Sequence, residues 1–287
     1  MNVPTIFKLH GLLFNEDIAF EFLCAHRIIE SHHQCVCGKS CVLNPRRKTY
    51  RCGGGLCRKE VSCFKDSFFS KSKLGCSKSL LFGYLWLTNC THTTICAQLG
   101  LSSATVTNYI RFFRELVADS LDDDDFVIGG PEIRVEIDES KLGKRKYHRG
   151  HRVDGVWVMG GVEHTAARKV FIEIVETRDA ETLQDVIVRH VLPGSIVVTD
   201  FWRGYLGLEE LGYTHLRLNH SLEFVDPVTG VCTNTIEGTW SSLKGKIPVR
   251  NRTSSCEDNL FEFIWRRKNS HDLWGGLISA LREIKYE

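Results

Sequence analysis

The chain has 287 residues, of which 43% are hydrophobic and 25% charged, and its formal net charge is +2. This composition is typical of a folded globular protein, and it excludes a collagen-like or predominantly disordered chain. No apolar run approaches the length of a transmembrane helix, and the first residues lack the basic segment and apolar core of a signal peptide. We therefore expect an intracellular protein without a membrane partner, nuclear in a eukaryotic host and otherwise cytoplasmic.

Charge and cysteine are distributed unevenly along the chain. Residues 32–78 contain eleven Lys or Arg and two acids, whereas residues 122–125 are four consecutive aspartates. A local basic stripe on a near-neutral chain fits a surface that binds phosphate. Ten of the twelve cysteines precede residue 97. Because thiols stay reduced inside cells, metal binding is favoured over a disulfide framework.

The region 1–78 is predicted to hold a helix and a zinc ribbon. Apolar residues recur at helical spacing over 18–29, which predicts an amphipathic helix. Two glycine-rich cysteine pairs follow, separated by the strand-like segment 48–51. Tetrahedral Zn²⁺ needs four thiolate or imidazole ligands, and we expect these to be Cys35, Cys37, Cys52 and Cys57. The first pair is shorter than the usual Cys-x₂-Cys, so Cys41 or His33 could replace one member.

The region 79–125 has the rhythm of a helix-turn-helix DNA-binding module. After a buried helix predicted at 80–87, a short helix ends at Gly100, and Ser102 or Ser103 can cap a second helix. The side chains that this second helix makes available to DNA are Ser103, Thr105, Thr107, Asn108 and Arg111. Plain helical-hairpin packing is the alternative. The acidic stretch 119–125 is interpreted as a solvated linker.

The region 131–287 changes to an α/β pattern. Alternating apolar and polar residues at 132–139 predict a strand, and two more strands are expected at 155–162 and 168–175. The remaining elements are a helix at 182–191, a buried strand at 196–199, a helix at 205–211, a short strand at 215–219, a helix at 234–245 and a helical tail at 258–284. Three antiparallel strands followed by helix, strand, helix, strand and helix is the order of a ribonuclease H-like fold.

Three carboxylates in this region predict a catalytic site. Asp138 ends the first strand, Asp200 ends the buried strand, and Glu237 lies on the helix 234–245. In a ribonuclease H-like fold the two strands are neighbours, so their aspartates can meet. Two Mg²⁺ or Mn²⁺ ions bind through a few carboxylates and leave positions for phosphate and water. The pattern therefore predicts phosphodiester chemistry on nucleic acid.

Further acids and bases surround this triad. Glu136 and Glu139 compete with Asp138, but alternation turns Glu139 to the opposite face of the sheet and places Glu136 two residues deeper. Lys244 shares a helix face with Glu237 and is expected to touch DNA phosphate. The basic run 141–152 supplies further expected DNA contacts, Lys144, Arg145 and Lys146. A solvated hairpin is the alternative for that run.

Four stretches carry a resemblance to a known family. Residues 135–139 read Val-Glu-Ile-Asp-Glu, and the others are 197–205, 219–230 and 233–244. Together they resemble the Merlin superfamily of cut-and-paste DNA transposases and the related bacterial insertion-sequence transposases. The resemblance runs from about residue 30 to about residue 270. It implies an Asp-Asp-Glu transposase that uses Mg²⁺ or Mn²⁺, with Asp138, Asp200 and Glu237 in the triad positions.

The same resemblance implies partners and leaves two rivals. The expected partners are the terminal inverted repeats of a transposon, target DNA and further copies of the chain. The N-terminal cysteine ribbon recurs in this family, although the Cys-x-Cys pair departs from its usual pattern. A domesticated, non-catalytic DNA-binding protein is one rival, against which the intact triad speaks. A structure-specific nuclease without strand transfer is the other.

Overall fold

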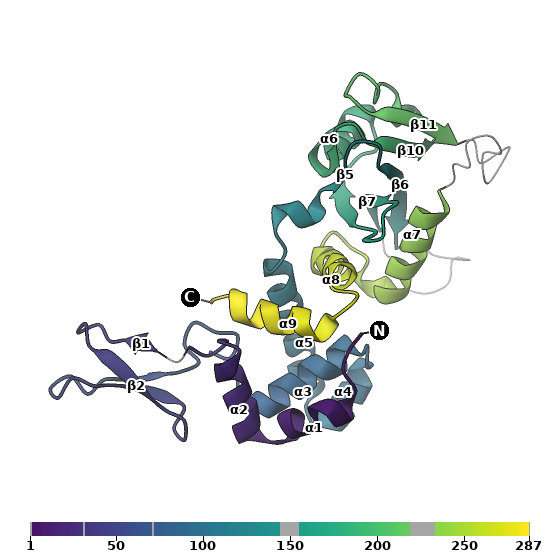
Figure 1. Ribbon diagram of the computed structural model, residues 1–287. Coiled ribbons are helices and arrows are strands. Elements are labelled where there is room, and N and C mark those ends of the chain that lie inside the picture. Colours follow the sequence, from purple (N-terminus) through teal and green to yellow (C-terminus); the bar gives the residue numbers. More distant parts are fainter. Residues whose placement is uncertain (1, 31, 71, 144–154, 219–232, 287) are drawn as a thin grey trace. The chain divides into compact units, whose positions relative to one another are not determined.

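The chain forms two compact units. The computed structural model describes residues 2–30, 32–70, 72–143, 155–218 and 233–286 (Figure 1). The first unit combines residues 1–120 with 269–287, and the second comprises residues 121–268. The last residues thus lie in the first unit, whereas the sequence assigned the helical tail to the domain 131–287.

Helices make up most of the first unit. They are α1 (Ile6–Phe14), α2 (Glu16–Ala25), α3 (Cys76–Leu87), α4 (His92–Leu99), α5 (Ser103–Asp119) and α9 (Leu273–Glu283). Close packing at Gly83 of α3 explains why α9 belongs here, because a Cβ atom there would lie 3.0 Å from Leu277 of α9 and 3.3 Å from Phe113 of α5. The helix predicted at 18–29 starts earlier, since Asn15 accepts hydrogen bonds from the backbone of Asp17 and Ile18.

The turn between α4 and α5 follows the predicted capping chemistry. Gly100 ends α4 with a φ of 59°, a left-handed conformation that costs glycine little. Ser102 caps α5 by accepting a hydrogen bond from the backbone N–H of Thr105. Both helices therefore lie where the sequence predicted them.

A small antiparallel sheet precedes α3. Its strands β1 (His33–Gln34), β2 (Ser40–Asn44), β3 (Thr49–Cys52) and β4 (Glu60–Ser62) pair in that order. Lys48, next to β3, forms an ion pair with Glu16 of α2. The Glu16 carboxylate also accepts hydrogen bonds from the backbone N–H groups of Cys76 and Ser77, each 2.9 Å long. One carboxylate thus ties this sheet and α2 to the first turn of α3, where the helix dipole favours a negative charge.

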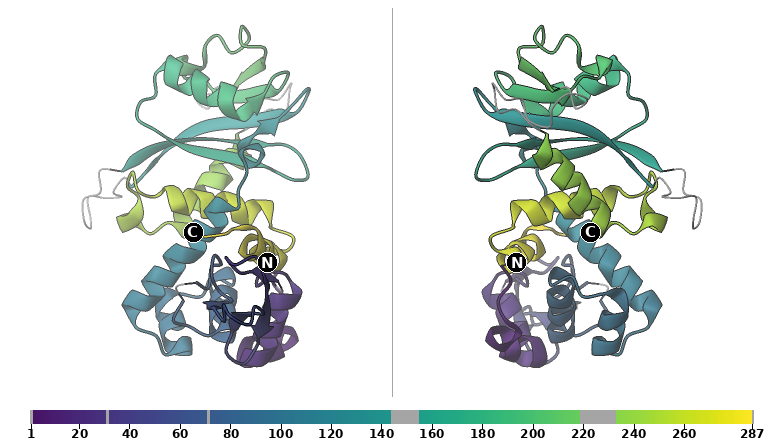
Figure 2. Two further views of the ribbon diagram at one scale, coloured as in Figure 1. Left: turned by 90° about the vertical axis from the view of Figure 1, so that its left-hand side faces the viewer. Right: turned by 90° about the vertical axis from the view of Figure 1, so that its right-hand side faces the viewer.

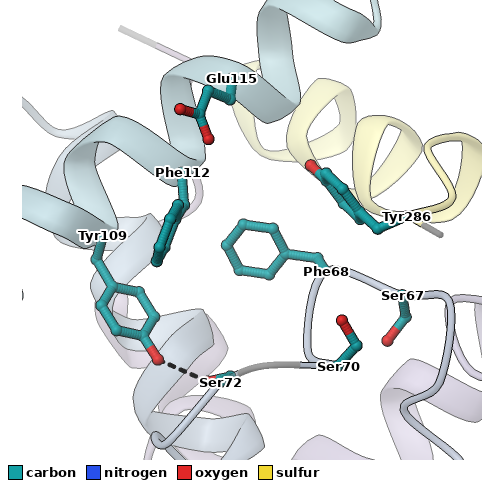
Figure 3. A pocket seen from close by; sticks show the side chains of 8 residues that line it. All are labelled: Ser67, Phe68, Ser70, Ser72, Tyr109, Phe112, Glu115 and Tyr286. Carbon is teal, nitrogen blue, oxygen red and sulfur yellow. Dashed lines mark hydrogen bonds between the residues drawn. The ribbon is translucent and has the colours of Figure 1, made fainter.

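The segment that leaves the small sheet is fastened to α5. A cavity of about 260 Å³ has a wall rich in aromatic rings (Figure 3), and it is lined by Ser67, Phe68, Ser70, Ser72, Tyr109, Phe112, Glu115 and Tyr286. Within it the hydroxyls of Ser72 and Tyr109 are hydrogen-bonded over 2.6 Å. Burial raises the pKa of Tyr286, whose backbone N–H donates to the carbonyl of Asp66.

A mixed sheet forms the centre of the second unit. Its strands are β6 (Arg134–Leu142), β7 (Val156–Glu163), β8 (Val170–Val175), β10 (Ile196–Asp200) and β11 (Thr214–Leu218). They are ordered β11-β10-β6-β7-β8, with β10 parallel to β6 and β11, and β7 antiparallel to β6 and β8. The carboxyl ends of β6, β8, β10 and β11 therefore lie at one edge of the sheet. A shorter parallel pair joins β5 (Ile128–Gly129) to β9 (Val191–Leu192) and follows the turn η1 (Asp123–Phe126).

Helices cover both faces of this sheet. Helix α6 (Ala180–His190) packs Leu183 and Val186 against odd-numbered strand residues such as Ile137. Helices α7 (Asn234–Lys246) and α8 (Glu257–Lys268), which flank the turn η3 (Val249–Asn251), pack Leu243 and Leu260 against even-numbered residues such as Val158. Figure 2 shows α6 and α7 on opposite sides of the sheet. The second unit is thus a mixed α/β structure whose strand residues alternate between two cores.

One predicted element is wrong. Residues 205–211 do not form a helix, because η2 (Arg203–Tyr205) is a single 3₁₀ turn that gives way to extended backbone at Leu206, and Gly207 has a φ of 93°. None of the helices in the described parts of the chain is long and apolar enough to cross a membrane.

Candidate active site and metal centre

Strand register places Asp138 beside Asp200. The parallel pairing of β6 and β10 matches Glu136 with Val198. Two residues further along both strands lie Asp138 and Asp200, so both side chains leave the sheet on the α7 face. Asp200 ends β10 as predicted, but β6 continues to Leu142, so the prediction that Asp138 ends its strand is wrong. Asp200 is half-buried, and its Oδ1 accepts a hydrogen bond from the backbone N–H of Trp202 over 2.9 Å.

Helix α7 is fastened to β6 by three polar contacts. Glu136 accepts the backbone N–H of Ile236 at 2.8 Å, Asp138 Oδ2 accepts the indole N–H of Trp240 at 3.0 Å, and Lys244 Nζ donates to Ser140 Oγ at 2.6 Å. The strand positions advance by two residues, about 6.6–6.8 Å, and the helix positions by four residues, about 6.0 Å. Because these two spacings are similar, α7 and β6 can lie side by side and keep all three contacts.

This docking places Glu237 in the first turn of a helix that is fastened to the strand of Asp138. Glu237 follows Ile236 in the first turn of α7 and is exposed. Burial raises the pKa of Asp138, the hydrogen bond from Trp240 opposes this, and the charges of Asp200 and Glu237 raise it further. The charges of two predicted carboxylates thus act on the third, Asp138. A divalent cation would relieve their mutual repulsion, and carboxylate oxygens are suitable ligands for Mg²⁺ or Mn²⁺.

The two neighbouring glutamates of β6 have other surroundings. Glu139 faces the α6 side, where its Oε2 accepts the hydroxyl of Tyr205 at 2.7 Å. Burial raises the pKa of Glu139, and its Oε1 has no hydrogen-bond partner among the described residues. Glu136 is fully buried on the α7 side and is also hydrogen-bonded to His164. Glu136 therefore holds the start of α7, and its carboxylate has no contact with solvent.

Sequence reasoning missed the second role of Trp240. It assigned this residue to the apolar stripe of α7, and the ring is indeed 4% exposed. The indole nitrogen nevertheless reaches Asp138, which a pattern of apolar residues cannot reveal. A buried tryptophan usually finds a partner for its N–H. The position of Trp240, three residues after the candidate ligand Glu237 on the same helix, was therefore the signal in the sequence that its N–H could contact the site.

Four cysteine thiols gather in the ribbon. The Sγ atoms of Cys35, Cys37, Cys52 and Cys57 all lie within 4.8 Å of one another. The Cys35–Cys57 and Cys37–Cys52 separations are 3.6 and 3.5 Å, close to the roughly 3.8 Å between sulfurs of a tetrahedral Zn²⁺ site. A hydrogen bond from the backbone of Cys37 lowers the pKa of Cys35 to about 7. The cluster could hold a structural zinc ion.

The two alternative ligands stand outside this cluster. Cys41 is buried opposite Cys52 in the β2–β3 pairing. Burial and the charges of the cluster thiols raise its pKa, as expected of a thiol kept protonated. The ring of His33 stacks on Tyr50, with 5.2 Å between the centroids.

The predicted DNA-contacting residues differ in their surroundings. On α5, Ser103, Asn108 and Arg111 are exposed and Thr105 is half-buried. Arg111 pairs with Glu115 at 3.4 Å. Lys244 is half-buried, and burial together with Arg252 lowers its pKa. Lys144, Arg145 and Lys146 lie outside the described residues.

Comparisons with known proteins point to one group. Residues 122–257, which contain Asp138, Asp200 and Glu237, match the family of the ISXO2-like transposase domain. The chain is also similar to an uncharacterized transposase-like protein of Haemophilus influenzae. Their identity is 32% over 104 residues, which cover 36% of this chain and 83% of that protein.

Proposed function

The chain belongs to the family of transposase-like proteins with an ISXO2-like transposase domain, and from this premise we propose that it cuts transposon ends and joins the resulting 3′-hydroxyl to target DNA. The observation that carries the proposal is the convergence on Asp138. The proposal is supported by the strand register, which aligns the positions of Asp138 and Asp200, and by the charges of Asp200 and Glu237, which both raise the pKa of Asp138. A half-buried carboxylate that feels the charges of two others is a poor arrangement for stability, but it suits a site that holds cations.

We assign the triad to Asp138, Asp200 and Glu237. A pair of Mg²⁺ or Mn²⁺ ions, when bound, would activate the attacking oxygen and stabilise the leaving oxygen of the phosphodiester. Asp138 is oriented for this by Trp240, and Asp200 by the backbone of Trp202. Glu237 is exposed and belongs to the first turn of α7, from which it can reach the same cations.

The fold of the second unit is proposed to be ribonuclease H-like. Supporting this are the strand order, the parallel β6–β10 pair that carries both aspartates, and helices on the two faces. Placement in the Merlin superfamily is proposed on the same four sequence stretches that carry the resemblance.

The first unit is proposed to bind DNA through two modules. Helices α4 and α5 would act as a helix-turn-helix, with α5 offering Ser103, Asn108 and Arg111. The ribbon, stabilised by zinc on the four clustered thiols, would contact phosphates through its basic residues. Terminal inverted repeats are the proposed ligand, and a homo-oligomer would bring two such ends together.

The test is strand transfer on the element's own ends. Purified full-length protein with Mg²⁺ should release the end and join it to a target plasmid, as separated on a sequencing gel. Asp138→Asn, Asp200→Asn and Glu237→Gln should each remove both products while end-binding persists. Glu139→Gln is the matched control, because this carboxylate faces the α6 side.

Two outcomes would change the proposal. Cleavage without joining would identify a structure-specific nuclease. Normal cleavage by Glu237→Gln, or a loss in Glu139→Gln as large as that in Asp138→Asn, would show that the triad is wrongly assigned.

A further inference from the structure

An alternating row of cationic and aromatic side chains lies on the α6 side of the edge that carries Asp138 and Asp200. We call this row the edge strip, and it consists of Lys141, Trp157, Arg178 and Trp202. Lys141 Nζ lies 5.5 Å from the ring centroid of Trp157, which is its partner in the β6–β7 register. The guanidinium of Arg178 lies 3.8 Å from the ring centroid of Trp157 and 5.2 Å from that of Trp202. Such contacts attract each cation to the ring face.

A second contact between a guanidinium group and an aromatic ring lies next to the edge strip. The guanidinium of Arg217 on β11 lies 4.5 Å from the ring centroid of Phe201. Arg217 is opposite Thr199 in the β10–β11 register, and Phe201 directly follows β10. The two residues that follow the end of β10, Phe201 and Trp202, therefore each have a guanidinium group against their ring.

Trp202 is held in place next to Asp200 through its backbone, while its indole lies on the α6 side. Its backbone N–H donates to Asp200 Oδ1 over 2.9 Å, and its indole N–H donates to the carbonyl of Arg178 over 3.3 Å. Gly204 makes room for the ring, because a Cβ atom there would come within 3.0 Å of it. The backbone of Trp202 is thus tied to Asp200, and its indole is tied to the backbone of Arg178.

These rings remain open to solvent. Phe201 is 52% exposed and Trp202 is 43% exposed. Large aromatic side chains contribute most to stability when they are buried. The stability of the fold therefore does not explain why two adjacent rings are held in place and yet exposed. The triad assignment uses Asp200 and the backbone N–H of Trp202, and it gives no role to the rings of Phe201 and Trp202.

We propose that Trp202 and Phe201 stack on unpaired bases of the DNA strand whose phosphate lies at the carboxylates. The occupant follows from the chemistry of the surface. Aromatic faces stack on any base, while Lys141, Arg178 and Arg217 supply the positive charge that a phosphate backbone requires. In a duplex each base face is covered by its neighbour, so these rings can be used only where a base is unpaired. The proposal rests on the proposed function, since it locates the strand relative to Asp200.

Base stacking can be measured without cleavage. Full-length protein carrying Asp138→Asn is titrated with a DNA end that contains 2-aminopurine in unpaired positions, and with the fully paired version of that end. Binding should quench the unpaired probe. Trp202→Ala should weaken binding of the unpaired end about five- to hundredfold, leave the paired end within twofold and remove the quenching. Trp202→Phe should restore most of both.

The controls separate stacking from folding. Phe7→Ala removes an aromatic ring of α1 that is 87% exposed and should change neither binding nor quenching. If Trp202→Ala unfolds, as judged by circular dichroism, Phe201→Ala carries the same test. Equal losses on paired and unpaired ends, or quenching that survives both alanine variants, would overturn the inference.

Failure of the proposed function is a separate result. Base stacking that depends on Trp202 in a protein that cuts no DNA would overturn the transposase proposal and keep this one. Efficient DNA cutting without any base stacking would overturn the stacking proposal and keep the transposase proposal.

Discussion

The indole N–H of Trp240 on α7 donates a hydrogen bond to Asp138 on β6, with 3.0 Å between the heavy atoms. The contact fixes which oxygen of Asp138 faces the helix, and it thereby orients the carboxylate. Partners of this kind orient the groups that bind metals, and their loss typically costs about 10–100-fold in metal affinity or activity.

Trp240→Phe should therefore raise the Mg²⁺ concentration needed for half-maximal cleavage by about 10-fold or more. The substitution keeps an aromatic ring but removes the N–H group. Cleavage is measured as a function of Mg²⁺ concentration. Trp274→Phe, which alters a similarly buried indole of α9 in the first unit, is the control. An unchanged Mg²⁺ requirement in Trp240→Phe would mean that the contact does not position Asp138.

Gly160→Ala tests the packing beneath Trp240. A Cβ atom at Gly160 would lie 2.7 Å from the indole and 2.8 Å from the carbonyl oxygen of Phe171. We expect a loss of about 1–3 kcal/mol in the free energy of unfolding of the second unit, because the indole cannot retreat without leaving Asp138.

Gly238→Ala is the matched substitution. Gly238 lies on α7 in open space. Alanine there should add about 0.5–1 kcal/mol of stability, since glycine is unfavourable inside a helix. Urea unfolding of both variants gives the comparison, and a similar loss in the two would argue against a specific role for Gly160.

Purified protein should contain close to one zinc per chain, held by the ribbon cysteines. Cys52→Ser removes a cluster thiol and should lose most of the metal, together with the folded ribbon, because structural zinc contributes folding energy directly. Cys41→Ser should keep it, since Cys41 pairs with Cys52 across the strands but stands outside the cluster. Metal content by mass spectrometry decides. A folded, zinc-free wild type would remove the site from the proposal.

Arg111→Ala should reduce binding of the specific DNA end by about 1–3 kcal/mol. Arg111 is an exposed cation of α5 that pairs only with Glu115 of the same helix, at 3.4 Å, among the described acids. Lys285→Ala is matched to it, because Lys285 is an exposed cation paired with Glu30 at 3.6 Å. Fluorescence anisotropy with full-length protein measures both. Equal effects would show that α5 does not read the DNA.

Glu16→Gln should destabilise the first unit, by about 1–3 kcal/mol near neutral pH, through the loss of charge-assisted hydrogen bonds. Burial raises the pKa of Glu16, but bonds from Lys48, Ser77 and Cys76 outweigh it and lower the pKa to about 2 from 4.5. Because the folded pKa is the lower one, the stabilisation is present above about 4.5 and is lost as the pH falls towards about 2.

The difference in unfolding free energy between wild type and Glu16→Gln, measured with urea, should therefore become smaller as the pH falls from about 4.5 towards about 2. Acid would release any metal held by the thiolates from both proteins equally, so only the difference between their unfolding free energies is interpreted. Glu21→Gln, at an exposed position on the same helix, is the control. A difference that stays constant with pH would contradict the assigned pKa.

Local patterns predicted much of the fold. Alternation at 132–139 placed Asp138 and Glu139 on opposite sides of β6, and they indeed contact Trp240 and Tyr205 from opposite faces. Gly100 and Ser102 marked the end of α4 and the start of α5, because capping depends on a few adjacent residues.

Non-local packing accounts for what the sequence could not predict. The expected helix at 205–211 failed because the Tyr205 side chain is drawn into the core beneath Glu139, and Gly207 turns the chain. The hydrogen bond from Trp240 joins residues 102 positions apart, and nothing in a periodic pattern specifies such a distance.

The grouping of α9 with the first 120 residues has a consequence for how the protein is made. The second unit is an insertion, and the chain passes between the units at 120–121 and again at 268–269. A growing polypeptide therefore cannot complete its first unit until the final helix has been synthesised, whereas the second unit can fold earlier. Premature termination early in α9 would spare the carboxylates in sequence, yet remove Leu277, which packs against Gly83 of α3.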